Sequence, residues 1–220
     1  MDIHRFITEL PDHYPDFLYP LEFARSDYHI DDSDFPAGPV TEYIGHMLNF
    51  AVSLLASGEA YLQLGSDSLA ALGYAMTGNL DKYYYLIAHF SIADMWETHL
   101  NAWIKRRPEY ASLLKVIKRD FFRNLQTEPL PLAHKIGVCF YNSFTSYKIL
   151  YKTLKWLEPY LAEQALVIVA DANWEDVRDA VKDWTIDDTG AFLIFDLPTP
   201  TNSFPTWWNG ILVLGHSKPG

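Results

Sequence analysis

The fold of this chain is decided by one stretch, Glu59-Ala60-Tyr61-Leu62-Gln63-Leu64-Gly65-Ser66-Asp67-Ser68-Leu69-Ala70-Ala71-Leu72-Gly73-Tyr74-Ala75-Met76. Its first part, up to Leu64, is typical of a partly apolar strand, and apolar residues recur at roughly helical spacing after Leu69. Between these parts, Gly65-Ser66-Asp67 combines a glycine with short polar side chains, which favours a tight turn. The sequence therefore predicts a strand, a turn and a helix in close succession.

Two interpretations of this turn are open. In the first, a side-chain oxygen of Ser66, Asp67 or Ser68 only caps the helix that follows. In the second, the backbone amides of Gly65, Ser66 and Asp67 bind a ligand, because ligands of such sheets lie outside a strand end and beside a helix N-terminus. The glycine pattern of a dinucleotide site is incomplete, since Ser66, Ser68 and Ala70 occupy the neighbouring positions.

The composition limits the class of protein. With 220 residues, of which 49% are hydrophobic, the chain can bury one substantial core, most simply in one domain. A formal net charge of -11 and the lack of a basic stripe argue against a nucleic-acid partner. The single cysteine, Cys139, excludes an intramolecular disulfide and is typical of a reducing compartment. It stands in an apolar run, so we interpret it as a small buried hydrophobic residue.

No segment predicts secretion or a membrane anchor. Residues Met1 to Phe6 lack the basic and then apolar pattern of a signal peptide. The longest apolar run, from about Met47 to Ala56, is too short to span a bilayer. We therefore expect a cytoplasmic protein without a membrane partner. The chain has 7 Trp, 14 Tyr and 13 Phe residues. We expect most of these aromatic residues to lie in the core, and the others to line a cleft or a homo-oligomer contact.

Residues 1–38 differ from the rest of the chain. They contain Pro11, Pro15, Pro20 and Pro36 but no strong helical or alternating period. This predicts an irregular N-terminal arm whose aromatic residues pack over an α/β domain at 39–220. Such an arm is either a lid over a substrate or a structural wrap.

Strand and helix patterns alternate along the rest of the chain. The first five predicted strands alternate with helices, which indicates a mostly parallel sheet with helices on both faces and right-handed crossovers. The last two strands follow one another without a helix, so we expect an antiparallel hairpin. The predicted fold class is therefore α/β, a Rossmann-like sheet of seven strands. The expected helices are 39–57, 69–76, 92–105, 146–161 and 175–184, and the expected strands are 61–64, 82–90, 113–117, 136–141, 165–170, 191–197 and 210–214.

Five short segments at the predicted strand ends carry a family resemblance. They are Tyr61-Leu62-Gln63-Leu64-Gly65, Leu86-Ile87-Ala88-His89-Phe90-Ser91, Arg119-Asp120-Phe121-Phe122, Phe140-Tyr141-Asn142-Ser143-Phe144-Thr145-Ser146-Tyr147 and Val167-Ile168-Val169-Ala170-Asp171-Ala172-Asn173-Trp174. In this order, they resemble the motifs of the class I S-adenosylmethionine-dependent methyltransferases, in particular a branch that acts on small molecules. The resemblance extends from about Pro39 to the C-terminus.

The resemblance implies S-adenosylmethionine as the cofactor and methyl transfer to a small hydroxylated acceptor. Asp171, Asn142 and Thr145 are the candidate catalytic residues, with Asp171 as a general base for the acceptor hydroxyl. A capping carboxylate for the helix at 175–184 is the other interpretation of Asp171. The positions implied to bind the cofactor are Gln63, Gly65, Ser66, Asp67, Ala88, His89, Asp120 and Phe121. Of these, His89 also suits a buried, hydrogen-bonded role, and Asp120 also suits a cap.

The departures from the family fall on acidic positions. Gln63 stands at the acid of the first motif, and Ala88 stands at the acid that normally holds the ribose hydroxyls. Asn142 replaces the acid after the fourth strand, and Ala170 leaves Asp171 as the remaining acid of a pair. Each lost hydrogen bond to a charged acceptor weakens binding by roughly 1–3 kcal/mol.

Two functions from different classes follow. The first is a methyltransferase, and the second is a non-catalytic protein of the same fold that uses a decayed cofactor site for binding or assembly. A dinucleotide-dependent oxidoreductase is disfavoured, because the glycine fingerprint and the acidic ribose partner are missing. The sequence predicts no metal site, since Asn142 and Asp171 together supply one negative charge and the histidines lack metal-ligand spacing.

Overall fold

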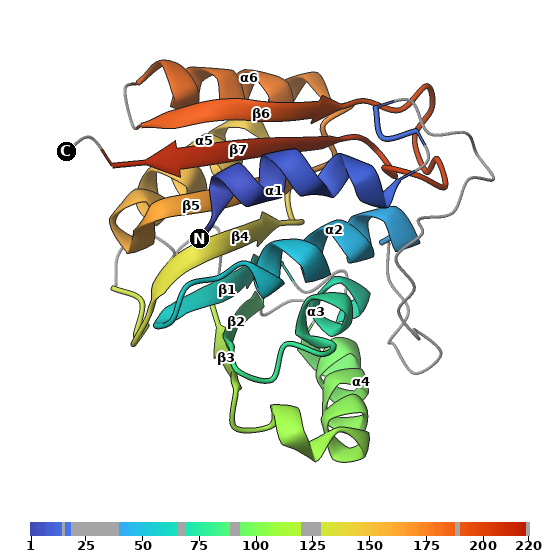
Figure 1. Ribbon diagram of the computed structural model, residues 1–220, viewed down its shortest axis with the longest axis vertical. Helices are drawn as coiled ribbons and strands as arrows, with labels where there is room; N and C mark the ends of the chain where they lie inside the picture. The colour runs from blue at the N-terminus through green and yellow to red at the C-terminus, as the bar shows by residue number, and fades with distance from the viewer. Residues whose placement is uncertain are drawn as a thin grey trace.

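Seven strands form one mixed sheet, in the order β3-β2-β1-β4-β5-β7-β6. Their bounds are β1 Glu59–Leu64, β2 Tyr83–Ala88, β3 Leu114–Lys118, β4 Lys135–Tyr141, β5 Leu161–Ala170, β6 Ala191–Leu197 and β7 Ile211–Ser217 (Figure 1). The computed structural model describes residues 1–14, 16–18, 40–65, 69–88, 93–119, 129–187 and 190–218. The five strands β3, β2, β1, β4 and β5, which lie side by side in this order, are parallel to one another. Strand β7 lies between β5 and β6 and is antiparallel to both. The predicted α/β class and the antiparallel pair at the end of the chain are confirmed.

The order of the strands reverses between β1 and β4. From β1 the chain moves outward to β2 and β3, then returns to β4 on the other side of β1. Ligands of open α/β sheets bind at such a switch point, outside the carboxyl ends of the strands. The register aligns Leu64 of β1 with Tyr141 of β4, so the two strands end together at this point.

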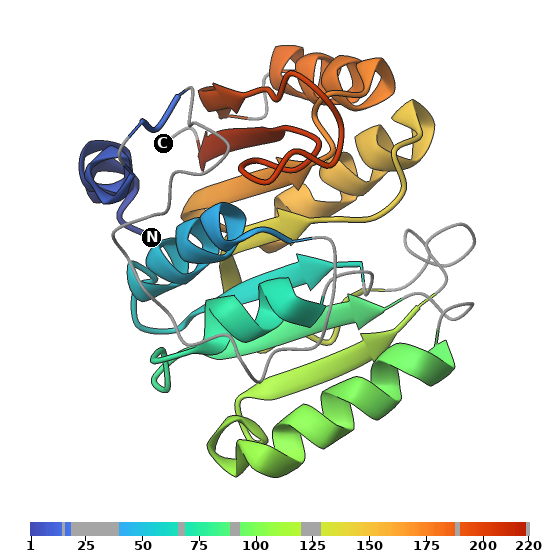
Figure 2. The ribbon, with the colours of Figure 1, turned by 90° about the vertical axis from the view of Figure 1, so that its right-hand side faces the viewer.

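Helices cover both faces of the sheet (Figure 2). On one face lie α1 (Ile3–Glu9), α2 (Glu42–Ser53), α3 (Leu69–Met76) and α4 (Ala93–Arg106), and on the other lie α5 (Tyr147–Leu157) and α6 (Glu175–Ile186). Alternate residues of β4 point to the two faces: Val138 and Phe140 join the first core, whereas Cys139 and Tyr141 join the second. Burial on both faces explains why β4 is an almost continuous apolar run.

The start of α2 differs from its prediction. The helix begins at Glu42 and not near Pro39, which lies outside the described residues. Thr41 is the N-cap, since its side-chain oxygen accepts the amide hydrogen of Ile44 at 3.4 Å. A short polar side chain two residues after the proline thus decides where the helix starts.

The end of α5 also differs from its prediction. The helix stops at Leu157, and a 3₁₀ turn, η4 (Glu158–Tyr160), leads directly into β5 at Leu161. Pro159 lies in this turn and cannot donate the hydrogen bond that a longer α-helix would need. The predicted helix therefore extended over this 3₁₀ turn and onto the first residue of β5.

A helix begins the chain where the sequence predicted an irregular arm. α1 starts after Asp2, whose carboxylate accepts the amide hydrogen of Arg5 at 3.0 Å. Phe6 on this helix is completely buried. The helix has only 7 residues, fewer than the window over which a helical period can be recognised. The predicted boundary between residues 38 and 39 lies outside the described part of the chain.

Two aromatic residues of the described N-terminal segment, Tyr14 and Phe17, pack against the connection between β6 and β7. The ring centroids of Tyr14 and Phe17 lie 5.3 and 5.6 Å from that of Trp207, in the connection between β6 and β7. The hydroxyl of Tyr14 donates to the backbone oxygen of Tyr43 in α2 at 2.9 Å. For residues 1–14 and 16–18, this packing supports the interpretation as a structural wrap.

We expect Phe6→Ala to lower the free energy of unfolding by about 3–5 kcal/mol, since the buried ring packs against Phe50 and Phe195. Thermal unfolding followed by circular dichroism measures the loss. Leu18→Ala is the matched control in the same segment, because Leu18 is 49% exposed and should change the unfolding temperature little. Equal losses for the two variants would contradict this packing.

Candidate functional site

The ends of β1 and β4 touch at Gly65. This residue follows β1 with φ of 110°, a conformation that favours glycine. A Cβ atom here would overlap the backbone oxygen of Asn142, which follows β4. The amide hydrogen of Asn142 in turn donates to the oxygen of Leu64 at 3.0 Å. Gly65 is therefore required by the contact between the two strand ends, whatever binds beside them.

The polar groups next to Gly65 are used within the protein. Its amide hydrogen donates to the oxygen of Ile87 in β2 at 3.0 Å. The buried side chain of Gln63 donates to the Gly65 oxygen at 3.1 Å and accepts from the Tyr61 hydroxyl at 3.1 Å. Gln63, which stands where the resembled family has the acid of its first motif, thus stabilises the turn through these hydrogen bonds. The other predicted residues of this turn, Ser66 and Asp67, lie outside the described residues.

The end of β2 presents no acid. Ala88 is completely buried, and its methyl group belongs to the core on the α1–α4 side. Its backbone oxygen accepts the amide hydrogen of Arg119 at 2.9 Å, which joins the ends of β2 and β3. His89, Asp120 and Phe121 lie outside the described residues, so their roles in cofactor binding stay predictions.

The candidate catalytic residues follow β4 and β5. These strands pair in parallel up to Tyr141 and Val169, so Asn142 and Asp171 come after neighbouring strand ends. Asn142 is buried, with 7% of its surface exposed, and Thr145 is partly exposed. The structure thus brings Asn142 next to Gly65 and places Asp171 at the adjacent strand end.

The carboxylate of Asp171 is held by the connection between β6 and β7. The side-chain amide of Asn209 donates to its Oδ1 at 2.7 Å. Burial raises the pKa of the Asp171 carboxyl, and the hydrogen bond from Asn209 lowers it by a smaller amount. The backbone of Asp171 adopts φ of 62°, which is uncommon for any residue other than glycine. Ser203 and Trp208, in the connection between β6 and β7, also have positive φ, of 60° and 56°.

The interpretation of Asp171 as a cap for α6 is wrong. α6 begins at Glu175, with Trp174 as its N-cap and no capping hydrogen bond from that side chain. The amide hydrogen of Trp174 donates to the backbone oxygen of Asp171 at 3.1 Å, while the carboxylate turns to Asn209. The helix therefore leaves the carboxylate available for the site.

Two asparagines, Asn173 of the fifth family-like segment and Asn209 outside every motif, fix this connection to the end of β5. The side chain of Asn173 donates to the backbone and hydroxyl oxygens of Thr199 at 3.1 and 2.9 Å and accepts the Thr199 amide hydrogen at 3.2 Å. The backbone amide of Asn173 donates to the oxygen of Asn209 at 2.7 Å. Asn209-Gly210 does predict a turn, but a turn signal does not identify a partner 38 residues away.

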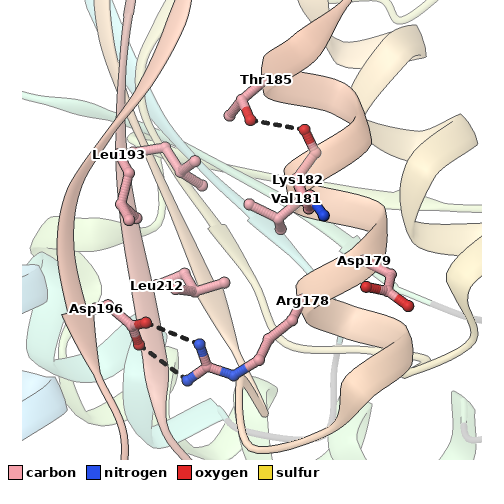
Figure 3. Close-up of a pocket in the computed structure, with 9 residues that line it drawn as sticks. Arg178, Asp179, Val181, Lys182, Thr185, Leu193, Asp196 and Leu212 are labelled. Atoms are coloured by element: carbon pink, nitrogen blue, oxygen red, sulfur yellow. Dashed lines mark hydrogen bonds and ion pairs between the residues drawn. The ribbon is translucent and has the colours of Figure 1, made fainter.

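A cavity of about 270 Å³ lies apart from these strand ends, between α6 and the outer strands (Figure 3). Arg178 of α6 and Asp196 of β6 form a bidentate ion pair beside it, with N–O distances of 2.8 and 2.9 Å. Its apolar lining consists of Val181, Leu193, Leu212 and Leu214. No predicted site residue lines it.

Three further properties of the described residues concern metal binding, thiol reactivity and membrane insertion. In the part of the chain that the structure describes, no group of three or more His, Cys, Asp or Glu residues could hold a metal ion. Cys139 is completely buried, and burial raises the pKa of its thiol, which does not suit a nucleophile. Within the same residues, no helix is both long and apolar enough to cross a membrane. A cytoplasmic location, a lack of nucleic-acid partners and a homo-oligomeric state stay predictions.

Solved methyltransferase structures are similar in fold to this chain. The O-methyltransferase of tomaymycin synthesis from Streptomyces achromogenes, solved with S-adenosylmethionine, has a TM-score of 0.58 and 13% identity, covering 82% of each chain. An O-methyltransferase from Bacillus cereus, solved with S-adenosylhomocysteine, has a TM-score of 0.60 and 11% identity, covering 84% of this chain and 86% of that one. Precorrin-6y C5,15-methyltransferase from Geobacter metallireducens has a TM-score of 0.60 and 12% identity, covering 86% of this chain and 96% of that one.

No protein-family model matches the sequence, and no curated protein matches it. At identities of 11–13%, the structural likeness shows the fold. The chain therefore has the fold of the class I S-adenosylmethionine-dependent methyltransferases. The resemblance found in the five strand-end segments is confirmed at this level.

We expect Gly65→Ala to destabilise the protein more than Gly58→Ala. Both glycines have positive φ, 110° and 82°, but only at Gly65 would the new Cβ overlap another backbone atom. The steric overlap should add about 1–3 kcal/mol to the loss. Urea unfolding measures the difference, and equal midpoints would show that β1 and β4 do not approach so closely.

Proposed function

We propose that the protein binds S-adenosylmethionine at the carboxyl ends of β1, β2 and β4 and methylates a small hydroxylated acceptor beside β5. The observation that carries this proposal is the Asp171 carboxylate, which Asn209 holds at the end of β5 and which α6 does not use. Two of the similar methyltransferases were solved with S-adenosylmethionine or S-adenosylhomocysteine, which supports the choice of cofactor.

In this proposal, Asp171 is the general base. The carboxylate accepts the proton of the acceptor hydroxyl as the oxygen becomes a nucleophile. Burial raises the pKa of this carboxyl, which makes it a stronger base than an exposed aspartate. In the same proposal, Asn142 and Thr145 orient the acceptor. S-adenosylmethionine supplies a methyl group on a reactive sulfonium, so orientation by these residues contributes most of the acceleration.

The structure also offers support for the second function, a non-catalytic protein with a decayed cofactor site. Gln63 directs its amide at Gly65 and Tyr61, and Ala88 is completely buried. Neither residue can offer the cofactor a carboxylate as a hydrogen-bond acceptor, as the resembled family does. The affinity for the cofactor discriminates between the two functions.

Calorimetric titration with S-adenosylmethionine and S-adenosylhomocysteine tests the proposed cofactor. We expect micromolar dissociation constants, weaker than those of a site that keeps its acids by roughly 10- to 100-fold per lost charged acceptor. A lack of heat at millimolar ligand would instead support the non-catalytic function.

We expect Asp171→Asn to lower methyl transfer strongly without weakening the fold. The new amide oxygen can still accept from Asn209, but the negative charge is lost. Because the folded pKa is raised above its ordinary value of 3.8, the ionised carboxylate lowers stability as pH rises through this range, and the variant should be at least as stable as the native protein at pH 7.

Release of S-adenosylhomocysteine with a panel of small phenols and alcohols measures transfer, which should fall about 100-fold or more. Cofactor affinity should not change. Glu175→Gln removes an exposed carboxylate nearby and is the matched control. Full transfer by Asp171→Asn would remove Asp171 from the mechanism.

A further inference from the structure

We propose that Asn209 is a positioning residue that orients the Asp171 carboxylate toward the methyl acceptor. The inference rests on the proposed function and adds a residue far from every motif in the sequence. Its basis is the hydrogen bond of 2.7 Å that Asn209 donates to Asp171 Oδ1. Three further observations support it, and they concern the direction of the amide, the rigidity of its loop and the surroundings of the carboxylate.

The direction of the Asn209 amide is determined by its second partner. Its Oδ1 accepts the backbone amide hydrogen of Ser203 at 2.6 Å, and the oxygen is the only end of an Asn amide that can accept a hydrogen bond. The Nδ2 end therefore faces Asp171. Asn209 presents a donor to the carboxylate, and a rotated amide would lose both hydrogen bonds.

The loop that carries Asn209 is held on several sides. Its backbone oxygen accepts the amide hydrogen of Asn173 at 2.7 Å. The preceding residue, Trp208, exchanges two backbone hydrogen bonds of 3.1 Å with Phe204 and accepts the Thr199 hydroxyl at 3.0 Å. These bonds connect the loop to itself and to the end of β5. Asn209 therefore approaches Asp171 from a fixed position.

Asn209 is the one hydrogen-bond donor that Asp171 Oδ1 has among the described residues, and no ion pair within them involves Asp171. The nearby Tyr141 hydroxyl donates to the backbone oxygen of Phe144 at 2.8 Å and so is directed away from the carboxylate. Asp171 Oδ2 has no hydrogen bond within this set. Because Asn209 holds Oδ1, Oδ2 is the oxygen that can take the hydroxyl proton from the methyl acceptor.

Asn209→Asp is the sharpest test. The new side chain keeps the shape and the oxygen that serves Ser203, but it replaces the donor by a second carboxylate beside Asp171. The pKa of the Asp171 carboxyl, followed by ¹³C NMR, should rise by at least one unit, because like charges disfavour ionisation. Asn209→Ala adds no charge and should give a smaller rise. Methyl transfer should fall at least tenfold in each variant, with cofactor affinity unchanged.

Two controls separate positioning from support of the loop. Asn202→Ala removes only the 3.1 Å contact of Asn202 with Asn173, so it should leave the pKa of Asp171 unchanged. The double variant Asn209→Asp/Asp171→Asn exchanges donor and acceptor, which restores the hydrogen bond but moves the charge. Its unfolding temperature should recover toward the native value, while methyl transfer should not.

An unchanged Asp171 pKa in both Asn209→Asp and Asn209→Ala would overturn the inference, as would an equal shift in Asn202→Ala. Recovery of methyl transfer in the double variant would show that Asn209 supports the loop only. The NMR and unfolding measurements need no cofactor. A protein that gives these shifts but binds no S-adenosylmethionine would disprove the proposed function and leave the Asn209–Asp171 pairing in place.

Discussion

The parallel pairing of β1 with β4 is the constraint on which the rest of the structure depends. The pairing runs from Glu59–Lys135 to Leu64–Tyr141, with one register shift between Ala60 and Tyr61, and the two strands end together at the switch point of the sheet. At that point the backbone after β4 comes so close to Gly65 that no side chain fits. A glycine in the first motif is commonly taken as a sign of a ligand. Here the packing of two strand ends is a sufficient reason for it.

The neutral residues Gln63 and Ala88 make contacts within the protein. Gln63 exchanges hydrogen bonds with Tyr61 and with the Gly65 turn, and Ala88 fills space in the core. Buried polar groups are costly unless they are paired, so a glutamine that satisfies its own turn is a stable replacement for an acid that would need a ligand. The acidic side chain that follows β5, Asp171, is partly buried, and the amide of Asn209 compensates part of this burial.

The connection between β6 and β7 links regions that are distant in sequence. Asn209 contacts Asp171, and Trp207, two residues earlier, packs against Tyr14 and Phe17 of the N-terminal segment. The hydroxyl of Thr41 also donates to the backbone oxygen of Thr206 in this connection. The first residues of the chain therefore support the loop that holds the candidate base.

The sequence by itself determined the class of fold, because periodicity and turn residues act locally. The alternation of apolar strands such as 136–141 with amphipathic helices was sufficient to predict the sheet, and motif order was sufficient to suggest the methyltransferase fold. Short-range signals were weaker at element ends, as the Thr41 cap and the Pro159 turn illustrate. Only the tertiary structure decided that Gln63 braces a turn, that Asp171 does not cap α6, and that Asn209 holds its carboxylate. Those contacts join residues through the folded sheet, and a single sequence carries no local pattern for a hydrogen bond across 38 positions.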